Sequence, residues 1–82
     1  MEIPQINKLS GTDSHDLLND YRVAHKTVEE AIKAVSAVWP HGRDYQRGNI
    51  SKAMEEHADR LRKLRQVAVD LMVIMEGIVN QT

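Results

Sequence analysis

The spacing of apolar residues in the second half of the chain constrains the fold most strongly. Between Ile50 and Ile78, apolar side chains and one histidine recur at alternating steps of four and three residues. Steps of this kind place side chains on one stripe of an α-helix, as in coiled coils. The stripe, called the second seam below, consists of Ile50, Met54, His57, Leu61, Leu64, Ala68, Leu71, Met75 and Ile78. The sequence therefore predicts a helix over residues 50–79, about 45 Å long.

A first seam with the same spacing precedes it. It consists of Leu17, Tyr21, Ala24, Val28, Ala31, Val35 and Val38, and beside it Leu18, His25, Ile32 and Trp39 recur every seven residues. Thr12 or Asp13 is a suitable N-cap. Pro40 cannot continue a helix and disfavours helical geometry at the preceding residue. We therefore expect a helix over residues 12–39, with Trp39 largely buried and fixing its end.

The fold class that follows is all-α. No alternating apolar–polar pattern typical of strands is present in the sequence. Two helices of similar length, joined by a loop at residues 40–49, predict an antiparallel hairpin. Residues 12–82 form this hairpin, and residues 1–11 are predicted to be an N-terminal arm because they contain proline and glycine. Its apolar side chains, Ile3, Ile6 and Leu9, could pack on a neighbour.

A hairpin of this sequence is predicted to self-associate. A chain of 82 residues with three aromatic side chains can bury only a modest core. The stretch 67–79, "VAVDLMVIMEGIV", is apolar on nearly every side, so one partner helix cannot cover it. It is too short to span a membrane and contains two acids. We expect a four-helix bundle or a larger closed oligomer. The predicted interface residues are Val67, Leu71, Met72, Ile74, Met75 and Ile78.

Composition excludes several kinds of site and makes other partners less favoured. The absence of cysteine removes disulfides, thiolate zinc sites and cysteine nucleophiles. A net charge of −1 gives no global attraction for nucleic acid or for an anionic membrane. The sequence has no apolar run of membrane-spanning length and no secretion signal, so a cytoplasmic location is expected.

The acidic residues do not form a catalytic pair. Glu29–Glu30 and Glu55–Glu56 are adjacent on helices, where neighbouring side chains diverge by about 100°. Glu29–Lys33, Glu56–Arg60 and Asp59–Lys63 have the spacing of ordinary surface ion pairs. Serines lack a nucleophile-elbow context and the glycines form no phosphate loop. We therefore predict no catalytic residues, no cofactor and no enzymatic activity.

The histidines are expected to be structural. Carboxylate-bridged metal bundles need glutamate three residues before histidine, and Met54 occupies that position relative to His57. His25 and Glu29 share a helix face, but one pair does not make a metal site. We expect His25 and His57 to be satisfied by local hydrogen bonds, and we predict no metal.

The basic run "RLRKLR", residues 60–65, raises the question of nucleic acid. Leu61 and Leu64 belong to the seam, so the four cations spread over the outer helix face beside Glu56 and Asp59. A short basic stripe crossing a dimer could contact phosphates. The acidic neighbours and the overall charge make a solvated face the preferred interpretation.

The loop "PHGRDYQRG" is the best candidate for a binding site. Proline, glycine and aspartate serve turn chemistry, with glycine supplying a positive φ. Arg43, Tyr45 and Arg47, with His41 beside them, are not needed for a turn. Arginine matches phosphate or carboxylate with forked donors, and free N–H groups at the start of the second helix favour an anion. A ligand or partner is therefore expected at His41, Arg43, Tyr45 and Arg47.

The motif "PHGRDY", between a heptad helix and a second helix carrying "MEEHADRLRKL", resembles small phage- and prophage-encoded proteins. A looser resemblance connects it to phage helical hairpins that sequester cyclic-nucleotide immune signals, the anti-CBASS sponges. Those share a Pro-x-x-Arg-acid turn, matched by Pro40, Arg43 and Asp44. Their threonine–leucine–glutamate and tryptophan–asparagine signature is absent after Ile50. The resemblance implies a phage accessory or counter-defence protein acting in the host cytoplasm.

Three functions remain open. The first is an oligomer that sequesters a phosphorylated nucleotide signal at the loop without catalysis. The alternative is a protein-interaction module that inhibits or regulates a host protein, for example a component of a defence system. A hairpin dimer that binds RNA or DNA is the third and least favoured.

Overall fold

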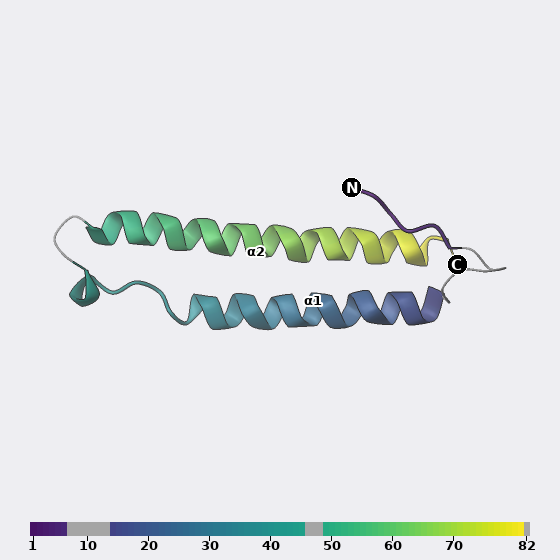
Figure 1. Ribbon diagram of the computed structural model, residues 1–82, viewed down its shortest axis with the longest axis horizontal. Coiled ribbons are helices and arrows are strands. Elements are labelled where there is room, and N and C mark those ends of the chain that lie inside the picture. The colour runs from purple at the N-terminus through teal and green to yellow at the C-terminus, as the bar shows by residue number, and fades with distance from the viewer. Residues whose placement is uncertain (7–13, 46–48, 82) are drawn as a thin grey trace.

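Two long antiparallel helices make up most of the molecule (Figure 1). The computed structural model describes residues 1–6, 14–45 and 49–81. Helix α1 spans Ser14–Ser36 and α2 spans Asn49–Val79, with a single 3-10 turn, η1, at Gly42–Asp44 between them. Strands are absent from these residues, and α1 packs along α2. The prediction of an all-α hairpin is confirmed.

The core of the hairpin lies on the second seam. Helix α2 begins one residue before the predicted start and ends as expected. Its three buried side chains, His57, Leu61 and Ile78, are all members of that seam. Leu61 is 4% exposed and Ile78 is completely covered. The four–three spacing therefore identified the face of α2 that α1 covers.

The contact stripe of α1 follows the first seam together with the residues predicted beside it. The half-buried apolar side chains and histidine of this helix are Leu17, Leu18, Tyr21, His25, Val28, Ala31, Ile32 and Val35. Ala24, which the first seam included, is exposed. The flanking positions Leu18, His25 and Ile32 therefore widen the covered stripe, and Ala24 is the exception to the first seam within α1.

Helix α1 ends earlier than predicted. Its last helical residue is Ser36, not Trp39, and Val38 donates to the carbonyl of Val35 at 3.2 Å in a tightened final turn. Pro40 has no N–H for the carbonyl of Ser36, and its ring crowds that carbonyl. The influence of the proline therefore reaches four residues back. The predicted caps at residues 12 and 13 lie outside the described residues.

Trp39 is less buried than predicted. Its side chain is 37% exposed, and Val38 beside it is 69% exposed. The indole contacts His57 edge to face, with ring centroids 5.0 Å apart and an interplanar angle of 88°. Because α1 ends before it, Trp39 reaches α2 from the loop, and the contact with α2 covers only part of the indole ring.

The hairpin is elongated and leaves much apolar surface uncovered. Its principal extents are 62 × 20 × 16 Å and its radius of gyration is 18.1 Å. A compact domain of this length has a radius of gyration of about 12 Å. Large apolar side chains of α2, including Val69 at 53% and Met72 at 43%, are exposed. Within the described residues, neither helix combines the length and apolar character needed to span a membrane.

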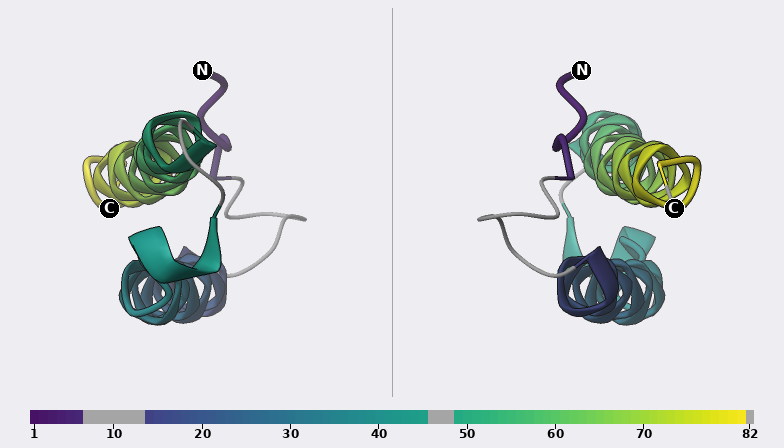
Figure 2. Two further views of the ribbon diagram at one scale, coloured as in Figure 1. Left: turned by 90° about the vertical axis from the view of Figure 1, so that its left-hand side faces the viewer. Right: turned by 90° about the vertical axis from the view of Figure 1, so that its right-hand side faces the viewer.

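Residues 1–6 of the predicted arm lie against α2 rather than α1. Figure 2 shows this segment beside α2 in both end-on views. The first residues of the chain and the last turn of α2 therefore meet at the open end of the hairpin, opposite the loop (Figure 1).

We expect the buried side chains of the second seam to contribute most of the stability of the hairpin. Leu61→Ala should lower the free energy of unfolding by about 3 kcal/mol, because it removes a buried side chain and leaves a cavity. Val23→Ala, at a position 57% exposed on α1, should change it by less than about 0.5 kcal/mol. Urea unfolding followed by circular dichroism measures both. Equal losses in the two variants would place the stabilising contact elsewhere.

Candidate functional site

The loop between the helices is a short ordered turn flanked by extended backbone. Asp44 donates its N–H to the carbonyl of His41 at 3.0 Å, and Tyr45 donates to Gly42 at 3.2 Å. His41 and Tyr45 are both extended, with φ of −112° and −131°. The φ of Gly42 lies outside the left-handed region, and a Cβ there would meet nothing within 4 Å. The predicted need for a positive φ at Gly42 is therefore wrong.

The turn brings three of the four predicted binding residues together. His41, Arg43 and Tyr45 are all exposed, and Tyr45 is 42% exposed. Among the described residues, Arg43 and Tyr45 have no side-chain hydrogen bond or ion pair. Arg47, the fourth predicted residue, lies outside the described residues. The guanidinium and the phenol are therefore not used to hold the turn together.

At the base of this turn, Trp39 and His57 form a contact that the sequence did not reveal. His57 is 3% exposed, and its Nε2 has no hydrogen-bond partner among the residues that the structure describes. The expectation of a hydrogen-bonded histidine is therefore wrong for this nitrogen. The seam position of His57 signalled its burial. Its pairing with Trp39 had no sequence signal, because it depends on the path of the chain after α1.

His25 behaves as expected for a structural histidine. Its Nδ1 lies 2.9 Å from Oε1 of Glu29, one turn further along α1. The predicted pair of Glu29 with Lys33 is not found among the ion pairs of the described residues. No group of three or more metal-ligating side chains occurs in the part of the chain that the structure describes.

The cations of the basic run are mostly paired with acids. Arg60 lies 3.7 Å from Glu56, and Lys63 lies 3.0 Å from Asp59, as their spacing predicted. Arg62 also contacts Asp59 at 2.7 Å. Hydrogen bonds from Arg62 and Lys63 hold the pKa of the Asp59 carboxyl below its ordinary value. These contacts partly compensate the positive charge that a phosphate backbone would need.

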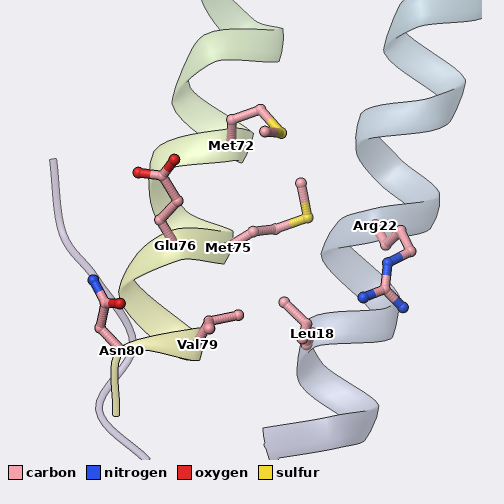
Figure 3. Close-up of a pocket in the computed structure, with 7 residues that line it drawn as sticks. All are labelled: Leu18, Arg22, Met72, Met75, Glu76, Val79 and Asn80. Carbon is pink, nitrogen blue, oxygen red and sulfur yellow. The ribbon is translucent and has the colours of Figure 1, made fainter. Parts of the chain in front are cut away.

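A groove of about 460 Å³ lies between the helices near their open end (Figure 3). Met75 and Val79 of α2 point toward α1, and Leu18 and Arg22 line the opposite side. The remaining lining residues are Met72, Glu76 and Asn80. Two methionines in one groove give a flexible apolar surface that can adapt to a partner.

The predicted interface residues occupy different environments. Val67 and Met72 are exposed, at 44% and 43%. Leu71, Ile74 and Met75 are half-buried. Ile78 is fully covered within one hairpin, so its side chain serves the intramolecular core.

Comparisons with protein-family models, with curated proteins and with solved structures find no match to this chain. The resemblance to phage hairpin proteins therefore stays a prediction from the motif in the loop.

The buried Nε2 of His57, without a hydrogen-bond partner among the described residues, leads to a prediction about stability. His57→Leu should raise the free energy of unfolding by about 1 kcal/mol, because it replaces a buried nitrogen without a partner by an apolar group. His41→Leu, at an exposed position, should change stability by less than about 0.5 kcal/mol. Chemical denaturation at neutral pH measures both. A clear loss of stability in His57→Leu would mean that contacts of the imidazole, including the one with Trp39, outweigh the cost of burying Nε2.

Proposed function

We propose that this protein is a non-enzymatic binding protein that presents the turn Trp39–Tyr45 to a partner protein. The observation that carries the proposal is the exposure of Trp39, Arg43 and Tyr45 at one end of the hairpin. Tryptophan, arginine and tyrosine are the residue types that dominate the binding energy of protein interfaces. Arg43 and Tyr45 have no side-chain hydrogen bond or ion pair among the described residues, so partner contacts would break no such bond.

A protein partner fits this surface better than a small molecule. Small-molecule sites are concave and bury most of their ligand. The groove at the open end and a second hollow along α1 are not lined by the turn. A turn that exposes aromatic and arginine side chains is suited to contact with a partner protein's surface.

Sequestration of a phosphorylated nucleotide is the second candidate. The unpaired guanidinium of Arg43 favours it, because a forked donor next to a tyrosine suits a phosphate and a base. The resemblance to phage signal-sequestering hairpins points the same way. In either case the expected setting is phage counter-defence in the host cytoplasm. Binding of RNA or DNA is the third candidate, and the acid partners of the basic run weaken it.

We also propose that the protein works as a homo-oligomer, with a four-helix bundle as the simplest form. The exposed apolar side chains of α2 and the elongated shape support this. A second hairpin lying on Val67, Met72 and the groove would cover surface that α1 leaves open.

The loop proposal predicts separable effects on binding and folding. Arg43→Ala with Tyr45→Ala should weaken partner binding by about 3 kcal/mol, roughly a hundredfold, through loss of charge-assisted and aromatic contacts. The melting temperature should stay unchanged, because exposed positions contribute little to stability. The partner is captured from infected cells with the wild-type protein, and affinity is then titrated with the purified components.

Arg65→Ala is the matched control, because Arg65 is exposed on α2 and lies away from the loop. It should bind as the wild type does. A panel of nucleotides in a melting assay separates the two candidates, since ligand at a hundred times its Kd adds about 2.7 kcal/mol. A melting shift with a nucleotide would favour sequestration. Full binding by the double variant would reduce the loop to a connector.

The oligomer proposal predicts that a charge on the open face of α2 separates the subunits. Met72→Glu should yield monomers, because it places a carboxylate in an apolar contact. Val23→Glu, at a position that is also exposed but lies on α1, should keep the oligomer mass. Light scattering measures the mass of each variant. Monomeric wild-type protein, or an unchanged mass for Met72→Glu, would contradict the proposed interface.

A further inference from the structure

The first six residues dock on the end of α2 with a regular pattern of burial. Ile3, Pro4 and Ile6 are half-buried, whereas Glu2 and Gln5 are exposed. Pro4 fixes its own φ and keeps Ile3 out of helical geometry. Ile3 and Ile6 are therefore the two partly covered isoleucines of the segment, on either side of Pro4 and Gln5.

Gln81 holds the backbone of this segment at two points. Its Nε2 donates to the carbonyl of Pro4 at 2.7 Å and to the carbonyl of Gly77 at 3.1 Å. Its Oε1 accepts the N–H of Ile6 at 2.9 Å. The two groups of the amide thus pair with the backbone on either side of Gln5, much as a neighbouring strand would. Such bonds recognise an extended backbone of any sequence, and side-chain contacts add specificity.

Gly77 provides the helix surface that the Ile3 side chain approaches. A Cβ at this position would lie 2.5 Å from Cγ2 of Ile3, so the Ile3 side chain or its segment would have to shift. Glycine inside a helix costs about 1 kcal/mol relative to alanine. The glycine therefore weakens α2 locally but lets the isoleucine approach the helix backbone.

From these contacts we propose that Gly77 and Gln81 form a binding site for an extended peptide of the pattern apolar–Pro–x–apolar. Residues 3–6, Ile-Pro-Gln-Ile, occupy it within the chain and are displaced by a partner segment of the same pattern. The contacts holding residues 3–6 are few and exposed to solvent, so the segment opens at a small free-energy cost. This site lies at the opposite end of the hairpin from the loop (Figure 1), and the inference does not rest on the loop's function.

The test uses the full chain and a synthetic peptide with the sequence of residues 1–6. Ile3→Asp removes the apolar anchor and frees the site. The peptide is titrated into the isotope-labelled variant while the Gly77 backbone amide and the Gln81 side-chain amide are followed by NMR. Saturable shifts of both signals are expected. Binding to the wild type should be at least about tenfold weaker, because the tethered segment competes at an effective concentration in the millimolar range.

Two glycine variants provide the matched comparison in the Ile3→Asp background. Gly77→Ala fills the contact point with a better helix former and should abolish binding. Gly42→Ala adds a methyl group in open space and should leave binding intact. If Ile3→Asp reduces helicity, the titration is repeated with Ile6→Asp, which removes the other apolar anchor instead. A peptide of the same composition with the proline moved to its end should not bind.

The inference is overturned by any of three results. These are the absence of saturable shifts in both opened variants, equal affinity for the wild type and the opened variant, or undiminished binding after Gly77→Ala.

Discussion

The contact between the two helices supports every other feature of this protein. It depends on one stripe of α2, where Leu61 and Ile78 are the buried apolar side chains. Neither the turn at Trp39–Tyr45 nor the segment 1–6 has a core of its own, so each is positioned by the end of the hairpin that carries it. The contact is also thin, because two helices can cover only one side of each other. The apolar surface left on α2 is the direct consequence.

The periodic part of the structure was predictable from the sequence. The four–three spacing placed α2 within one residue of its observed start and identified the seam to which His57, Leu61 and Ile78 belong. Prediction failed where periodicity ends. The early end of α1 and the exposure of Trp39 depend on how Pro40 acts on the preceding turn, which the spacing does not encode.

Contacts between distant parts of the chain could not be predicted from the sequence either. Gly77 faces Ile3, which lies at the other end of the sequence, and no pattern in the sequence indicates this contact. The candidate loop was identified from residue types alone, and the structure places His41, Arg43 and Tyr45 on one exposed turn. The missing partner of His57 could not be predicted, because an unsatisfied nitrogen is a property of three-dimensional packing. Periodic patterns reveal faces of helices, whereas single contacts between ends require the fold.

We proposed that one hairpin is stabilised by a second copy that covers the apolar surface left on α2. The most direct measurement is the thermal unfolding midpoint, followed by circular dichroism over roughly a thousandfold range of protein concentration, because association makes it depend on concentration. We expect the midpoint to rise with concentration, together with a native mass that is a multiple of 9.3 kDa. A midpoint independent of concentration, with a mass of 9.3 kDa throughout, would contradict the account.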